Sequence, residues 1–106
     1  MKQIFGSIVA LGLILVSCES TERAAPPLTA QMATRARATQ HIELNALERG
    51  RSLFVSRCIE CHTLPSIAQH SAAAWPGLID EMAQRASLKP EERQAVLAYI
   101  LVVREQ

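Results

Sequence analysis

Aromatic residues are scarce in this chain of 106 residues, at 4% of the total. Binding platforms for single-stranded nucleic acid use aromatic side chains for stacking, so this composition argues against a nucleic-acid partner. The formal net charge of +1 leaves no surplus of either sign to attract a polyanion. The sequence contains no acid–base constellation, nucleophile triad or phosphate-binding loop, which predicts a protein that is not an enzyme. It also has no alternating strand pattern, so we expect an all-α fold.

The chain is short, with room for one small domain. Domains of this size bury a low fraction of their surface and often depend on a metal, disulfides or another covalent staple. Three cysteines are present, and an odd number in an exported protein needs an explanation. One of them ends a hydrophobic leader and the other two belong to a single short motif, so we do not expect a disulfide framework.

Residues 1–17 are predicted to be a signal peptide. Lys2 precedes an apolar run from Ile4 to Val16, the usual order of basic and hydrophobic regions. At helical rise this run covers about 20 Å, less than the ~30 Å hydrocarbon core of a bilayer, which argues against an uncleaved spanning anchor. We therefore expect the chain to be exported.

The apolar run ends in Leu15-Val16-Ser17-Cys18, which resembles a bacterial lipobox. The resemblance implies that Cys18 is lipidated and becomes the first residue of the mature chain, anchored to a membrane by its acyl chains. The alternative is a soluble export signal in which this cysteine is incidental. Glu19 in place of aspartate slightly favours the outer membrane, by resemblance to lipoprotein sorting rules. We thus predict a lipid-anchored protein on the periplasmic side of the cell envelope.

Residues 18–44 are predicted to be a flexible tether between this lipidated cysteine and the domain. No apolar period is visible after the leader, and Pro26 and Pro27 interrupt the stretch. Met32, Arg35 and Arg37 are accordingly expected to be solvated linker residues.

Residues 45–106 are predicted to form the domain, with three main helices. Asn45 and Glu48 resemble a capping box, which predicts a helix from Ala46 to Arg57. Its apolar stripe is formed by Leu44, Leu47, Phe54 and Cys58.

Two prolines suited to a first helical turn predict where the next two helices begin. One helix is expected from Pro76 to about Ala86 and the last from Pro90 to about Val103. The apolar face of the last helix comprises Val96, Tyr99, Ile100 and Val103.

The strongest chemical motif is Cys58-Ile59-Glu60-Cys61-His62. Two thiols separated by two residues can add to the two vinyl groups of one porphyrin, and the adjoining histidine then lies beneath its iron. The motif therefore predicts one covalently attached haem c, held by Cys58 and Cys61, with His62 as the proximal iron ligand. A thioredoxin-like dithiol is the first alternative, but it requires a βαβ setting. A zinc site is the second, but it requires four ligands, and only His70 follows.

Over Ala46 to Val103 the chain resembles the class I cytochromes c. The residues that carry the resemblance are Gly50, Leu53, Phe54, the Cys58–His62 motif, Thr63 and Tyr99. It implies a small cytochrome c-like fold in which the first helix crosses the last, with Gly50 and Phe54 meeting Tyr99. It also implies that Pro65 and Trp75 lie at the edge of the haem.

A sixth iron ligand is expected between the motif and the last helix, where Met82 is the only methionine. A thioether favours Fe(II), so a His/Met pair raises the reduction potential. Met82 also shares a helical face with other apolar residues and could be ordinary core. His70 competes with Met82 for this role, and an iron whose sixth position is open or water-bound is the third option.

Taken together, these features predict an electron-transfer protein that passes single electrons between redox proteins of the bacterial cell envelope. It would act either as a free shuttle or as a subunit of a periplasmic oxidoreductase. The alternative function is a haem sensor or peroxidase-like module with an open sixth iron position.

Overall fold

The computed structural model describes residues 23–58 and 66–105, and this part of the chain contains helices and loops but no strand. The all-α prediction is therefore confirmed for these residues. Their elements are α2 (Ala30–Gln40), α3 (Leu44–Arg57), the short 3₁₀ helix η2 (Ile67–Gln69), α4 (Trp75–Arg85) and α5 (Pro90–Arg104). None of the helices in the described ranges has the length and apolar character needed to cross a bilayer.

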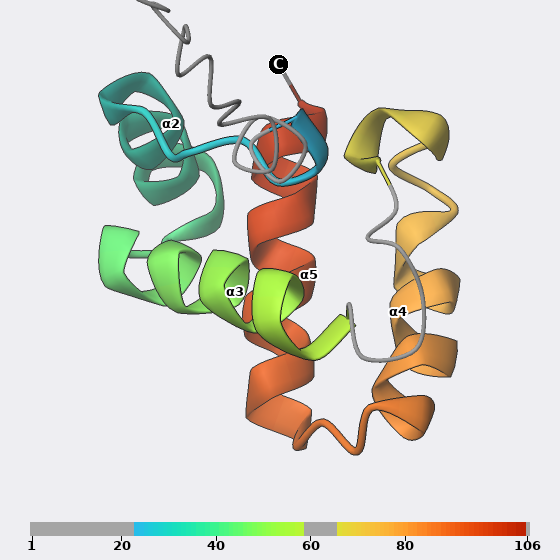
Figure 1. The fold of residues 1–106 in the computed structure, drawn as a ribbon. Helices are drawn as coiled ribbons and strands as arrows, with labels where there is room; N and C mark the ends of the chain where they lie inside the picture. The colour runs from blue at the N-terminus through green and yellow to red at the C-terminus, as the bar shows by residue number, and fades with distance from the viewer. Residues whose placement is uncertain (1–22, 59–65, 106) are drawn as a thin grey trace, which may run out of the picture.

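The C-terminal helix α5 lies at the centre of the arrangement (Figure 1). Helix α3 crosses it, and the C-terminal end of α3 points toward α4 on the other side. Helix α2 packs near the C-terminal half of α5, where Met32 and Ala36 meet Val102. Every described helix therefore depends on α5 as its packing partner.

The predicted helix boundaries agree closely with the structure for α4 and α5. Each of these two helices begins and ends within one residue of its predicted boundary. Helix α3 begins at Leu44, two residues earlier than expected, and its N-cap is Glu43. The predicted capping box at Asn45 is therefore wrong, because Asn45 already lies inside the first turn. Leu44 is also 43% exposed, so it does not belong to the buried stripe.

The crossing of α3 and α5 is close because Gly50 has no side chain. A Cβ atom at this position would lie 2.0 Å from the carbonyl oxygen of Ala95 and 3.0 Å from Cβ of Tyr99. Both distances are far inside van der Waals contact, and the nearer neighbour is backbone that cannot rotate away. The expectation that Gly50 permits a close crossing at Tyr99 is confirmed.

Three of the few aromatic residues form the centre of the core. Phe54 on α3, Trp75 on α4 and Tyr99 on α5 are each fully buried. The ring of Phe54 lies edge-on to Trp75, with centroids 6.4 Å apart, and tilted against Tyr99 at 6.2 Å. Such arrangements are favoured by the quadrupoles of aromatic rings. One ring from each helix therefore joins α3, α4 and α5 into a single core.

The prediction of a flexible tether over residues 18–44 is wrong for its described C-terminal part. Ala30–Gln40 is a helix, and Thr29 caps it by accepting a hydrogen bond from the Met32 N–H at 3.2 Å. Met32 is 2% exposed and packs with Leu47 of α3, so it is a core residue and not a solvated linker residue. The sequence pattern missed this helix because alanine, with the highest helix propensity, contributes almost no apolar periodicity.

A short segment ahead of α2 is also bound to the domain. Ala25 is fully buried, and its carbonyl accepts hydrogen bonds from Nε and Nη2 of Arg51 at 3.1 and 3.0 Å. The Tyr99 hydroxyl donates to the Pro26 carbonyl at 2.6 Å. The folded body therefore includes the chain from about Ala25, some twenty residues earlier than the predicted boundary at residue 45.

Replacing Gly50 with alanine is expected to lower the free energy of unfolding by about 1–3 kcal/mol, because the added methyl group must push α3 away from α5. The matched control is Gly77→Ala on α4, where a Cβ atom meets nothing within 4 Å. There the helix propensity of alanine is expected to leave stability unchanged or raise it by up to about 1 kcal/mol. Equilibrium urea unfolding measures both, and a Gly50→Ala protein as stable as the control would contradict the close crossing.

Stability is expected to fall between pH 10 and pH 12 because of Tyr99. Burial raises the pKa of Tyr99 from 10.0 to about 12, although the neighbouring Arg51 guanidinium lowers it in part. Tyr99 ionises at a lower pH in the unfolded chain, so its contribution to the free energy of unfolding is complete below pH 10. This contribution decreases by about 2 kcal/mol as the pH rises to 12. Tyr99 is the single tyrosine, so phenolate absorbance reports its titration directly. Tyr99→Phe should lose this step in urea unfolding, and an unchanged step would assign it to another group.

Candidate functional site

Cys58 is the one residue of the predicted cofactor motif that the structure describes; Cys61 and His62 lie outside the described residues, as does Cys18. It follows the last residue of α3 as the C-cap, and its N–H bonds to the Phe54 carbonyl. Because residues four apart lie on one side of a helix, Cys58 shares the inner side of α3 with Phe54. It is only 8% exposed and belongs to the same apolar cluster as Trp75 and Tyr99.

Met82, the predicted sixth ligand, is carried by α4. It is partly buried and packs against the same apolar cluster that contains Cys58. Leu78, one turn earlier on α4, and Leu53 on α3 also pack there. The structure thus places the first motif cysteine and the candidate methionine on a common core, although they are far apart in sequence.

Trp75 forms one wall of this core at the start of α4. Its indole Nε1 donates a buried hydrogen bond of 3.1 Å to the carbonyl of Ile67. This bond satisfies the polar atom of a fully buried ring and fixes η2 against α4. The implied place of Trp75 at a haem edge stays a prediction, as does that of Pro65, which lies outside the described residues.

His70, the alternative ligand, lies in the loop between η2 and α4. Its ring packs edge-on against Trp75, with centroids 5.3 Å apart, and its carbonyl accepts a 2.8 Å hydrogen bond from Nε of Arg104. His70 thus lies next to the N-terminal end of α4, whereas Met82 lies in the C-terminal half. The two candidate ligands therefore lie near opposite ends of α4, His70 in the loop before the helix and Met82 on the helix itself.

Arg57, which immediately precedes Cys58, borders the site and was not expected there from the sequence. Its Nη2 donates a 2.6 Å hydrogen bond to the Ala86 carbonyl at the end of α4. A lone arginine in the last turn of a helix is a common feature with no specific meaning. No sequence signal identifies this contact, because it depends on how α3 and α4 meet.

The chemistry of the described core fits a bound haem. The core of the described ranges contains no buried polar or charged residue and no unsatisfied buried side-chain polar atom. A porphyrin requires an apolar environment, and thiol, imidazole and thioether groups are the donors that hold and ligate a c-type haem. Within the described residues, no group of three or more His, Cys, Asp or Glu side chains is arranged to hold a metal ion on its own.

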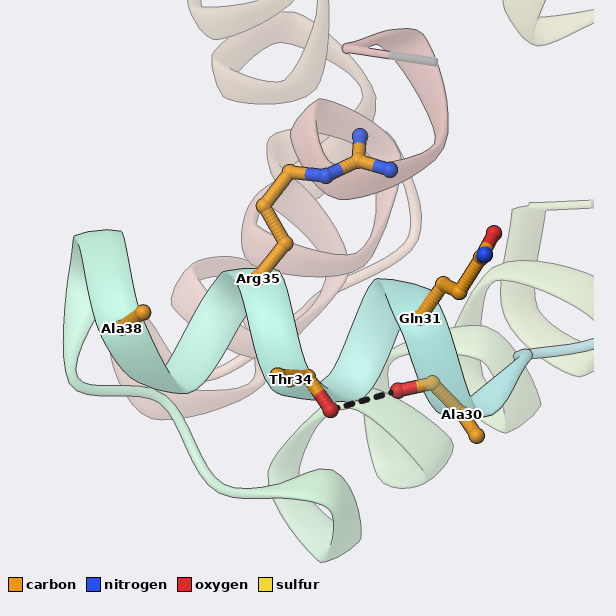
Figure 2. A pocket seen from close by; sticks show the side chains of 5 residues that line it. All are labelled: Ala30, Gln31, Thr34, Arg35 and Ala38. Carbon is orange, nitrogen blue, oxygen red and sulfur yellow. Dashed lines mark hydrogen bonds between the residues drawn. The ribbon is translucent and has the colours of Figure 1, made fainter.

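Two hollows lie on the surface of the described helices. One, of about 550 Å³, lies along α2 and is lined by Ala30, Gln31, Thr34, Arg35 and Ala38 (Figure 2). The Thr34 hydroxyl there donates to the Ala30 carbonyl at 2.9 Å, within the helix itself. The other, of about 450 Å³, is lined by Glu48, Arg51, Ser52, Val55 and Ser56 on α3. Neither hollow contains a predicted site residue.

Comparisons of the chain with models of protein families, with curated proteins and with solved structures found no match.

Proposed function

We propose that this protein is a small class I-type cytochrome c that carries one covalently attached haem and transfers single electrons between redox proteins. The observation that carries the proposal is the position of Cys58. The first cysteine of a Cys-x-x-Cys-His motif ends a helix on an apolar core, with a methionine from another helix packed against the same core. A helical setting of this kind supports the haem interpretation over the thioredoxin-like one, which needs strands next to the motif.

Each residue of the site has a definite part in this proposal. Cys58 and Cys61 would hold the haem through thioether bonds, and His62 and Met82 would ligate its iron. The haem supplies a one-electron Fe(II)/Fe(III) couple. The apolar side chains around Phe54 keep water from the site, and an environment of low polarity together with a thioether ligand favours the less charged Fe(II) state.

We further propose that the protein acts on the periplasmic side of the bacterial cell envelope, anchored by a lipid on Cys18. The bound segment around Ala25 makes the proposed tether much shorter than the sequence predicted. Cys18 and Ala25 are seven positions apart, and that length of chain spans at most about 25 Å. A short tether holds a carrier close to the membrane and raises its effective concentration at a redox partner fixed there.

The haem proposal is tested on protein produced together with a cytochrome c maturation system. The wild-type protein is expected to stay coloured after denaturation and to give the spectrum of a c-type haem in alkaline pyridine. Cys58→Ala should retain at most one thioether bond, which shifts that spectrum toward that of a haem with one free vinyl group. A colourless wild-type protein whose motif thiols react fully with an alkylating reagent would rule the proposal out.

Replacement of the candidate ligands distinguishes the carrier from a sensor or peroxidase-like protein. Met82→Leu is expected to remove the sulfur-to-iron charge-transfer band of the ferric protein and to allow carbon monoxide to bind the ferrous protein. It should also lower the reduction potential by more than about 100 mV, because axial ligands control the potential over a wide range. His70→Ala is the matched control and should leave the band intact. A wild-type protein that lacks the band and binds carbon monoxide readily would favour an open sixth position.

A further inference from the structure

Arg57 connects the start of the cofactor motif to the end of the helix that carries Met82. It is the last residue of α3, adjacent to Cys58, and its Nη2 lies 2.6 Å from the Ala86 carbonyl oxygen. A hydrogen bond from a guanidinium group is charge-assisted and stronger than one between neutral groups. The side chain is 32% exposed, so solvent screens this bond only in part.

The Ala86 carbonyl belongs to a rigid helix end. The Ala86 N–H donates to the Met82 carbonyl at 2.9 Å, and the Leu88 N–H donates to the Ala83 carbonyl at 2.9 Å. Ser87 between them is in the left-handed conformation, with φ of 54°. The bond from Leu88 to Ala83 around a left-handed residue is the 6→1 bond found at the ends of many helices, and it stops α4 in a defined geometry. A cation at this point also interacts favourably with the C-terminal end of the helix dipole.

Glu92 on α5 orients the arginine. Its carboxylate oxygen Oε1 accepts a 2.9 Å hydrogen bond from the Lys89 N–H, and Oε2 lies 4.0 Å from Nη1 of Arg57. The Glu92 side chain is only 13% exposed, so it cannot move freely. The guanidinium is therefore held between the first turn of α5 and the last turn of α4.

We propose that Arg57 is a positioning residue for the sixth iron ligand. By binding the Ala86 carbonyl, it fixes the C-terminal half of α4, and with it Met82, relative to Cys58. It would act through α4 and not as an iron ligand itself. This inference rests on the proposed function, and it means that the first motif cysteine and the proposed sixth ligand are coupled through one side chain.

A second arginine provides a matched control. Arg93 on α5 forms an ion pair with Asp80 on α4, so it also secures α4. This ion pair connects α4 to α5, however, and includes no residue of α3. Loss of either arginine should lower stability, but only loss of Arg57 should release Met82 from its place relative to Cys58.

The experiment compares Arg57→Gln, Glu92→Gln and Arg93→Gln in the holoprotein. Exogenous imidazole competes with Met82 for ferric iron, so its apparent affinity measures how often Met82 is released. Arg57→Gln is expected to bind imidazole about tenfold more tightly than wild type and to lower the intensity of the sulfur-to-iron band. Glu92→Gln keeps the bond to Lys89 but loses the charge, and a smaller gain of about threefold is expected. Arg93→Gln should stay within about twofold of wild type even though its urea midpoint falls.

The outcomes separate this inference from the proposed function. A wild-type protein without covalent haem would end both. A different result is that the wild-type protein has haem and a sulfur-to-iron band, but Arg57→Gln binds imidazole no more tightly than wild type does. That result would overturn the positioning role alone. Equal gains in Arg57→Gln and Arg93→Gln would also overturn it, because the effect would then follow general destabilisation. Restoration of wild-type imidazole affinity by Arg57→Lys would support it, because lysine retains a charged donor.

Discussion

The close contact between α3 and α5 at Gly50 is the constraint on which the rest of the structure depends. Because no side chain separates the helices, the Gly50 backbone lies directly against Ala95 and Tyr99. The short distance between the two helices brings Phe54 and Tyr99 into one buried cluster, which also contains Trp75 of α4. Cys58 is one turn beyond Phe54, so the same crossing fixes where the predicted haem-binding motif begins.

The N-terminal segment strengthens this crossing from the outside. Arg51 on α3 and Tyr99 on α5 both bind the backbone around Ala25 and Pro26, so the segment joins the two helices at their contact. Met32 and Ala36 of α2 then fill the space between Leu47 and Val102. A small domain buries only a modest apolar core. The contacts of α2 add to the core that the three predicted helices form.

Helix α4 is attached differently. Besides the apolar contacts of Trp75 and Ile79, α4 is held by polar contacts along its length. The Trp75 indole binds η2 at its start, Arg93 pairs with Asp80 in its middle, and Arg57 binds the Ala86 carbonyl at its end. Polar contacts at a partly exposed surface are weaker and easier to open than a buried helix crossing. Single side chains therefore help to set the position of α4, the helix that carries Met82, the proposed sixth ligand.

Local signals in the sequence were sufficient for α4 and α5, because a proline in the first turn and a strong apolar face are both properties of neighbouring residues. The Cys58–His62 motif was equally visible, because residue type and spacing alone define it; the chemistry that it predicts stays a prediction. Helix α2 could not be identified from the sequence, because its alanines form no apolar pattern and its buried side is defined only by contact with Leu47 and Val102. The N-cap of α3 could not be identified either. Nor could the sequence reveal the contacts of Arg57 or of the segment at Ala25, because their partners are 29 and 26 residues away. The sequence by itself determined the helical character of the described part of the chain, and it predicted the chemistry of the Cys58–His62 motif. Only the tertiary structure decided which distant backbone groups Arg51 and Arg57 bind, because hydrogen-bond partners far apart in the chain meet only when the helices pack.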